Sequence, residues 1–187
     1  MRLVAAALFA LLSLFVAADF PLLAKEPAAL PDREVEFAGK ALKLAWQSEN
    51  PELPVEEFIP ADQTLEKWTT LASIRRFPDL DDAKGLAAST LETVSESYPG
   101  APTNMVEKPD VDEAIIEFVV ESPDGASAEA FVEYNLFKYV KDPKGGVVAQ
   151  QYALRTYDDK AKFLTHLKEI RQGLIDEMAA TGLQEKK

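Results

Sequence analysis

Three segments in the second half of the chain alternate apolar and polar residues and are joined by tight turns. They read EAIIEFVVES from Glu113, SAEAFVEYNLFKYV from Ser127 and VVAQQYALRTY from Val147. The connecting sequences SPDG and KDPKGG are rich in residues that favour turns. A period of two predicts strands, and connections this short join only antiparallel neighbours. The sequence therefore predicts an antiparallel meander, which excludes all-helical folds and folds that alternate strands and helices throughout.

The alternation also predicts how the first two of these strands pair. Their apolar positions form two evenly spaced sets, Ala114, Ile116, Phe118 and Val120 in one strand and Ala128, Ala130, Val132, Tyr134, Leu136 and Val140 in the other. Pairing Val120 with Ala128 brings both sets onto one face. The opposite face carries Phe131, Phe137 and Tyr139 among glutamates, so we expect protein to cover both sides of part of the sheet.

The first half of the chain predicts further strands. Residues 34–47, EVEFAGKALKLAWQ, have the pattern of a hairpin that turns at Gly39 and places Leu42, Leu44 and Trp46 on one face. Four more segments follow, a short strand VEEFIP (55–60), one helical turn ADQTLEKW (61–68), a strand WTTLASIRRF (68–77) and a strand TNMVEKP (103–109).

Two segments repeat their apolar residues with a helical period. Residues 78–100 begin with Pro and three aspartates, which suit a helix N-terminus, and residues 158–180 carry a clear apolar stripe. The stripes are Ala83, Ala87, Leu91, Val94 and Tyr98 in the first helix and Phe163, Leu167, Ile170, Leu174 and Met178 in the second. TGLQEKK, which follows, is predicted as a polar tail. We therefore expect one α+β domain over residues 25–187, with an antiparallel sheet of about six to eight strands flanked by two main helices.

The N-terminus has the pattern of a secretory signal. Arg2 precedes an apolar run that ends near Ala18, which is short for a membrane span. Residues 1–18 are the predicted signal peptide, and cleavage after Ala24 or retention as an uncleaved anchor helix are the alternatives. The chain has no cysteine to carry a lipid. We expect a periplasmic or secreted protein with no membrane span after cleavage.

The charge of the chain limits its partners. The formal net charge is −12, and no basic stripe interrupts it. Phosphate backbones and anionic lipid headgroups are repelled by such a chain, so the sequence argues against nucleic acid as a partner. The acidity serves solubility or forms a docking surface for a basic partner, such as another exported protein, whose identity the sequence leaves unknown.

The sequence offers little of the usual machinery of catalysis. It has no cysteine, a single histidine at His166, no G-x-S-x-G motif and no glycine-rich phosphate loop. The acidic cluster at 79–85 departs from calcium-loop spacing, and acids at a helix N-terminus explain it better. The cluster at 109–113 has the chemistry of a weak site for a hard cation, and a turn with solvated acids is the alternative that we favour. Pairs of carboxylates remain open as acid–base groups. We therefore predict no enzyme, no cofactor and no metal site.

Five residues are candidates for contacts with a ligand or a partner, namely Trp68, Arg75, Arg76, Phe137 and Tyr139. Arg75 and Arg76 form the one local positive feature, and on a strand they point to opposite faces, so only one of them can serve a given site. The aromatic residues, together with Trp46 and Tyr134, either line a pocket between helix and sheet or pack in the core.

The segment FIPADQTLEKWTTLASIRRF resembles a pattern of uncharacterised exported bacterial proteins, through Thr64, Leu65, Trp68 and Thr69. From Val35 to Met178 the order of elements resembles the PsbP-like fold, a sandwich of an antiparallel sheet and helices. That resemblance implies an accessory or assembly protein without catalytic residues. We expect a non-enzymatic exported protein that binds a protein or a small apolar ligand. A hydrolase-like enzyme that uses carboxylates, and an envelope-associated structural protein, remain alternatives.

Overall fold

The computed structural model describes residues 30–122 and 129–186. The predicted signal peptide and its cleavage sites lie outside the described residues. The elements are β1 (Glu34–Phe37), β2 (Lys40–Gln47), β3 (Val55–Ile59), β4 (Thr70–Phe77), α2 (Ala83–Ser97), β5 (Thr103–Glu107), β6 (Glu113–Glu121), β7 (Val132–Lys141), β8 (Val147–Thr156), α3 (Lys160–Ala180) and β9 (Gln184–Glu185). None of the described helices is long and apolar enough to cross a membrane.

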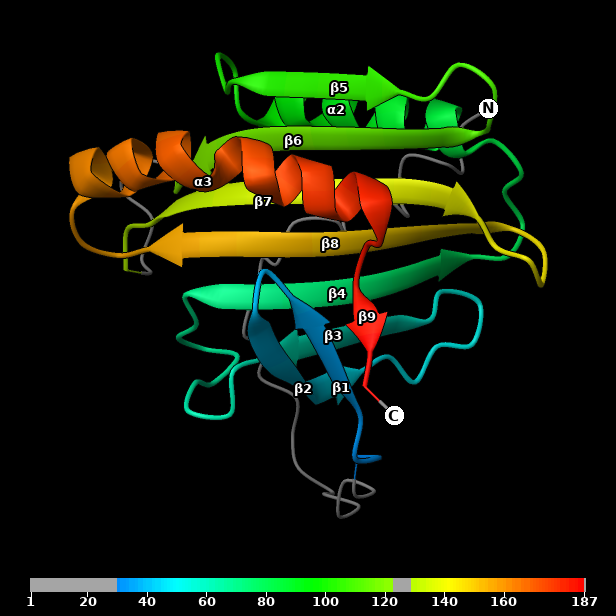
Figure 1. Ribbon diagram of the computed structural model, residues 1–187, viewed down its shortest axis with the longest axis horizontal. Helices are drawn as coiled ribbons and strands as arrows, with labels where there is room; N and C mark the ends of the chain where they lie inside the picture. Colours follow the sequence, from blue (N-terminus) through cyan, green and yellow to red (C-terminus); the bar gives the residue numbers. More distant parts are fainter. Residues whose placement is uncertain (1–29, 123–128, 187) are drawn as a thin grey trace.

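The nine strands of the described residues form one sheet in the order β5-β6-β7-β8-β4-β3-β2-β1-β9. Every neighbouring pair is antiparallel. The sheet is curled into a half-barrel, with α3 drawn in front of it and α2 behind it (Figure 1). The α+β class, the antiparallel sheet and the two main helices are thus confirmed, with one strand more than the upper end of the expected range.

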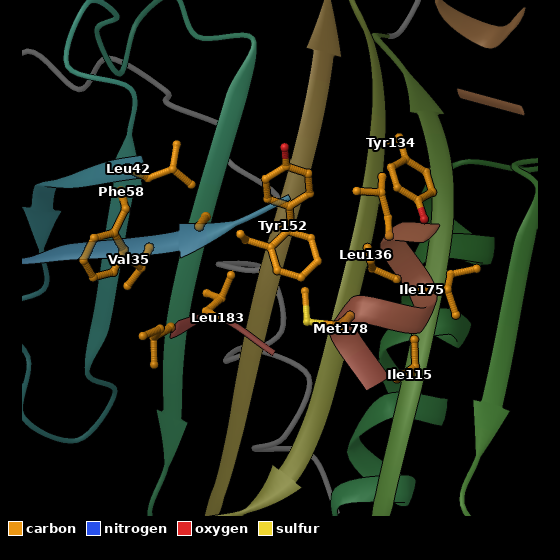
Figure 2. Packing of buried hydrophobic residues seen from close by; sticks show 14 of the residues in the cluster. Val35, Leu42, Phe58, Ile115, Tyr134, Leu136, Tyr152, Ile175, Met178 and Leu183 are labelled. Atoms are coloured by element: carbon orange, nitrogen blue, oxygen red, sulfur yellow. The ribbon is translucent and has the colours of Figure 1, made fainter. Parts of the chain in front are cut away.

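The main core lies between α3 and the face of the sheet that we call the α3 face. Leu167, Leu174, Ile175 and Met178 of α3 are buried there. Figure 2 shows Ile175 and Met178 beside Ile115, Leu136 and Tyr152 of three sheet strands, which belong to the same cluster. The predicted apolar stripe of this helix is confirmed because its residues at three- and four-residue spacing meet the alternate residues of the strands.

A second core lies on the opposite face, which we call the α2 face. Leu86, Ala87 and Val94 of α2 pack against residues that include Ile116 and Phe137. The Thr90 hydroxyl lies 3.0 Å from the Tyr139 hydroxyl. Both sides of the central strands are therefore covered, as the apolar residues on each face predict.

The two acidic clusters hold the start of α2. Asp82 caps the helix by accepting a hydrogen bond from the Gly85 amide at 2.8 Å. Asp112, in the loop before β6, accepts from the amides of Ala83 and Lys84 at 3.1 and 3.0 Å. Carboxylates are favourable here because the first amides of a helix lack partners within the helix. In the described residues no group of three or more acids, histidines or cysteines is placed to hold a metal ion.

The predicted register of β6 and β7 is wrong. Val120 pairs with Glu133 rather than with Ala128, and Ile116 pairs with Phe137. The shift is an odd number of residues, so Tyr134 and Leu136 lie on the α3 face and Phe137 and Tyr139 share the α2 face with Ile116. Alternation alone could not select the register, because both faces of β7 are apolar.

The segment before β4 also differs from its prediction. Residues 61–68 contain turns and an isolated bridge between Thr64 and Lys67 instead of a helical turn. Gln63 holds this segment, because its side chain accepts from the Thr69 amide at 2.8 Å and donates to the Thr69 hydroxyl at 2.9 Å. Strand β4 begins at Thr70, so Trp68 lies in the turn and not in the strand.

The predicted polar tail is instead the last strand of the sheet. Leu183 is buried at 5% exposure, and the next two residues form β9, which pairs with β1. The backbone amide of Leu183 donates to the Gln150 side chain at 3.0 Å. One apolar residue and a few backbone bonds are too weak a pattern to read as a strand in an otherwise polar segment.

A β-bulge in β2 turns Trp46 away from the main core. Leu44 pairs with Phe58, but Trp46 pairs with Glu57, so one extra residue, Ala45, is inserted between them. The shared face predicted for Leu44 and Trp46 is therefore wrong, since Trp46 lies on the α2 face with Glu57. The Trp46 side chain is 39% exposed there.

Candidate functional site

Seven polar side chains cross the α2 face of the sheet from β3 to β7, and we call them the polar chain. They are Glu57, Ser73, Arg75, Gln151, Asn135, Glu133 and Arg155. The first six are buried, with at most 9% exposure, and Arg155 is half-buried. Strand interiors rarely hold so many polar groups, so this face is the strongest candidate for a site.

The register of the sheet brings these residues together. Glu57 of β3 lies directly opposite Ser73 of β4, and Ser73 lies opposite Gln151 of β8. On the far side of β8, Arg155 lies opposite Glu133 of β7. Residues directly opposite each other in antiparallel strands share a face, so residues far apart in the sequence form one continuous surface.

Hydrogen bonds connect the middle of the polar chain. The Gln151 side-chain oxygen accepts from the Ser73 hydroxyl at 2.9 Å and from the Arg75 guanidinium at 3.2 Å. The Gln151 amide donates to the Asn135 oxygen at 2.6 Å, and the Asn135 amide donates to Glu133 at 2.8 Å. Each amide is therefore held in one orientation, and the groups form a prearranged network.

At one end of the polar chain, Arg155 is enclosed by a carboxylate and three aromatic residues, which we call the Arg155 cage. Its Nε donates to Glu133 at 2.7 Å. Its guanidinium lies 3.9 Å from the Trp68 ring centre and 4.2 Å from that of Phe131. Its Nη1 is 3.4 Å from the Tyr157 hydroxyl. A guanidinium is stabilised by this combination of a charged acceptor and aromatic faces.

At the other end of the polar chain, the Glu57 carboxylate differs from that of Glu133 because it has no hydrogen-bonded cation among the described residues. Burial raises the pKa of Glu57, and the attraction of Arg75 opposes that rise without cancelling it. In residues 30–122 and 129–186, no hydrogen bond reaches its carboxylate. The exposed Trp46 lies directly opposite it on β2. This end of the polar chain therefore combines a poorly solvated acid with an accessible aromatic ring.

Four of the five predicted contact residues lie on this face. Trp68 forms part of the Arg155 cage, and Arg75 belongs to the polar chain. Phe137 lies opposite Gln151 and stacks between Phe118 and Tyr139, with ring centres 5.9 and 5.8 Å apart. Trp68, Phe137 and Tyr139 are all buried, so they support the face from within.

Arg76 lies elsewhere. Arg76 points to the α3 face and donates to Asp142, in the turn after β7, at 2.7 Å. The two arginines thus face opposite ways, as expected for neighbours in a strand. His166 is exposed on α3, and its Nδ1 lies 3.7 Å from Glu169.

Apart from Arg75, sequence reasoning missed the other six members of the polar chain, which are Glu57, Ser73, Asn135, Glu133, Gln151 and Arg155. Their signal was the appearance of polar residues at strand positions in phase with large apolar ones, such as Asn135 two places before Phe137. These positions meet through the register of β7 with β8 and of β8 with β4, which the sequence did not predict. Without the pairings, each polar residue looked like a solvated one.

A second buried acid lies on the other face and serves packing. Glu117 accepts hydrogen bonds from the Tyr134 hydroxyl at 2.9 Å, from the Asn104 amide at 2.9 Å and from Arg171 of α3 at 2.7 Å. Burial would raise the pKa of Glu117, but these three partners outweigh burial and lower it. The group joins α3 to the sheet and leaves little of the carboxylate for a ligand.

Comparison with known proteins places the chain in a family and leaves its activity open. A protein-family model matches residues 29–183, so the chain belongs to that family, which is uncharacterised. No curated protein and no solved structure matches the chain significantly. These comparisons give no support to the PsbP-like resemblance.

Proposed function

We propose that this chain is an exported protein that works by binding, and that it binds through the α2 face where the polar chain ends at Glu57 and Trp46. The observation that carries the proposal is the pairing of a buried, poorly solvated carboxylate with an exposed tryptophan. A β-bulge turns that tryptophan onto the face. Bulges of this kind commonly re-aim a side chain beside a functional site.

The energetics of the polar chain support binding. An apolar set of residues would give a sheet face of similar or greater stability, because desolvating charged groups costs about as much as their pairing returns. The polar chain instead keeps amide and guanidinium groups in fixed orientations. A ligand that meets groups already held in place loses less free energy to ordering on binding. The ligand we expect therefore carries polar groups as well as an apolar surface.

The export part of the proposal rests on the N-terminal sequence. An apolar run after Arg2 followed by small residues before Asp19 is typical of a cleaved signal. An accessory role in the periplasm agrees with the PsbP-like resemblance of the element order. N-terminal sequencing of the protein recovered from the periplasm tests this part. We expect a mature chain that starts at Asp19 or at Lys25, and a chain that still starts at Met1 would contradict export by cleavage.

The binding part is tested by capture from periplasmic extract with three immobilised proteins. These are the wild type, the Trp46→Ala variant and a Val111→Ala control, which removes another exposed apolar side chain, in the loop between β5 and β6. Both target residues are exposed, so neither change should unfold the protein. We expect the wild type and the control to retain the same species, identified by mass spectrometry, and Trp46→Ala to lose it. Equal capture by all three proteins would contradict the proposed face.

One observation favours a second candidate, an enzyme that uses carboxylates. The raised pKa keeps the Glu57 carboxyl protonated to a higher pH than an exposed glutamate, and a protonated carboxyl can act as a general acid. Under this alternative, the captured species would be converted to product by the wild type and left intact by Glu57→Gln. Recovery of the unchanged species from the wild type would support the binding function instead.

A further inference from the structure

We infer that Trp46 and Glu57 form a subsite for an organic cation, either an ammonium or a guanidinium group, carried by a small ligand or by a side chain of a partner protein. This inference rests on the proposed binding function and names the chemistry that the face would recognise. It follows from three observations, which are a cation site formed by the same two kinds of residue elsewhere on this face, the exposure of Trp46 opposite Glu57, and the burial of the Glu57 carboxyl.

The cation site already present is the Arg155 cage at the far end of the polar chain. There the guanidinium of Arg155 is held between the Glu133 carboxylate, at 2.7 Å, and the ring of Trp68, at 3.9 Å from its centre. A tryptophan face and a carboxylate together form a cation site, because the ring attracts positive charge and the carboxylate pairs with it. The fold therefore already uses this pair of groups for a cation of its own.

The same two groups recur at the near end. Trp46 on β2 and Glu57 on β3 are partners across the two strands, so their side chains start from neighbouring positions on the same face. The Trp46 side chain is 39% exposed, whereas Trp68 in the Arg155 cage is only 2% exposed. A cation from outside can therefore reach the ring of Trp46, while the ring of Trp68 is occupied by the chain itself.

The carboxylate of Glu57 gains from such a ligand. It is 9% exposed, and no hydrogen bond from residues 30–122 and 129–186 stabilises its ionised form. The charged groups that face it are Arg75 from β4 and, farther along β2, Lys43, which lies opposite Ile59. Arg75 lies on the β4 side of Glu57 and Trp46 on the β2 side, so the β2 side of the carboxylate is where a second cation fits. A carboxylate has enough lone pairs to accept from both sides.

The charge of the chain favours the same ligand class. A net charge of −12 attracts cations and speeds their encounter with the protein. The sequence left two explanations for this acidity, solubility and a docking surface for a basic partner. The Trp46–Glu57 pair favours the docking surface, because it gives a basic group a defined place to bind.

The test uses the two tryptophans as separate reporters. Their side-chain N–H groups give two signals in a ¹H–¹⁵N spectrum of the labelled protein, assigned with Trp46→Phe. Ethylguanidinium and tetramethylammonium are the small probes, and a short peptide with one arginine represents a partner side chain. Ethylurea, which has nearly the shape of ethylguanidinium without its charge, is the matched neutral probe.

We expect the cations to shift the Trp46 signal in a saturable way, and ethylurea to leave it in place. Glu57→Gln should weaken cation binding about tenfold, as expected for the loss of one charged contact. The exposed Glu52→Gln should not change it. Affinity should also rise with pH as Glu57 ionises. Stronger binding of the peptide than of the small cations would indicate a partner protein as the source, and the reverse order would indicate a small ligand.

Several results would overturn the inference. These are equal shifts with ethylurea, a shift at Trp68 alone, or unchanged affinity in Glu57→Gln. If the cations fail to shift Trp46 while Trp46→Ala still loses the captured species, the cation assignment is wrong and the binding face stands. If Trp46→Ala retains that species as well, the proposed function fails with it.

Discussion

Glu57 is the residue at which stability and function are expected to oppose each other. Its carboxyl is buried in the sheet and its pKa is raised above the ordinary value of 4.5. A group whose pKa is raised on folding favours the folded state when it is protonated. Its contribution is complete below pH 4.5 and is lost as the pH rises through the raised pKa. The native glutamate therefore weakens the fold at neutral and alkaline pH.

The first prediction follows from the destabilising effect of the ionised Glu57 carboxylate. Glu57→Gln should be more stable than the wild type at pH 8, by about 1 kcal/mol, and equal to it near pH 4. Urea unfolding of both proteins between pH 4 and pH 8 measures the difference. Glu52→Gln, an exposed change of the same kind, should track the wild type throughout. A difference between Glu57→Gln and the wild type that shrinks as the pH rises would show that the carboxylate is better stabilised than its surroundings indicate.

Arg155 is the residue that joins the aromatic side chains to the polar chain. Arg155→Ala leaves the buried Glu133 without its cation and opens a space beside Trp68. We predict a loss of about 3–5 kcal/mol, as for a buried ion pair broken at one partner. Millimolar ethylguanidinium should restore part of the stability because it fits the vacated space. Thermal unfolding with and without the compound measures this effect.

The matched control for Arg155 is Arg76→Ala. Arg76 is paired with Asp142 and its side chain is 41% exposed, so removing it should cost less than about 1 kcal/mol. No addition of ethylguanidinium should improve it. Equal recovery of both variants would point to a general effect of the compound and against a built cation site at Arg155.

At the scale of elements, one buried acid contributes to the attachment of α3. Glu117 of β6 accepts from Tyr134 of β7 and from Arg171 of α3, and these hydrogen bonds hold its pKa below 4.5. A group whose pKa is lowered on folding stabilises the protein above its unfolded pKa, and that contribution disappears as the pH falls through the lowered value. The contact between helix and sheet is therefore acid-sensitive.

The third prediction concerns this contact. Glu117→Gln should cost about 2 kcal/mol at pH 7, within the range of hydrogen bonds to a charged group, and the cost should shrink steadily below pH 4. Urea unfolding at pH 7, 4 and 3 gives the comparison. Glu169→Gln on the exposed side of α3 is the control and should cost little at any pH. A cost for Glu117→Gln that persists at pH 3 would mean that shape, and not charge, holds the helix.

The elements and the antiparallel neighbours joined by short turns were largely predictable, and the register was not. The stripe of α3 and the alternation of β6 are local patterns, because each depends on residues within one element. The register of β6 and β7 depends on both faces being covered, which no single segment reveals. Strand β9 depends on Leu183 and on the free edge of β1. Such features exist only once distant segments meet, so sequence periodicity could not select them.

The candidate site, too, could be predicted from the sequence only in part. Trp68, Arg75, Phe137 and Tyr139 were predicted as contacts, and the structure brings them to one face. The polar partners that connect them come from four strands, β3, β4, β7 and β8, and look solvated in isolation. Trp46 was predicted to share a face with Leu44, but the bulge at Ala45 turns Trp46 to the opposite face of the sheet. A single inserted residue leaves no mark in the alternation, because Ala fits either side of a strand.

At the scale of the whole molecule, the two cores share the same strands. Strands β6, β7 and β8 contribute alternate residues to both, such as Ile115 to the α3 core and Ile116 to the α2 core. Neither helix can therefore leave without exposing one side of strands whose other side is still packed. Cooperativity of this kind is typical of single domains of this size.

The last prediction tests whether the two cores unfold together. Leu174→Ala removes a buried side chain from the α3 core, and Leu86→Ala removes one from the α2 core. Each should cost about 2–5 kcal/mol. Both should shift one common transition, seen alike by far-ultraviolet circular dichroism, which follows the sheet and helices, and by tryptophan fluorescence. If Leu86→Ala instead produced an early step in one signal only, α2 would be an independently unfolding cover. Ligands would then reach the neighbouring polar chain only after local unfolding of α2, and the polar chain would not be a preformed binding face.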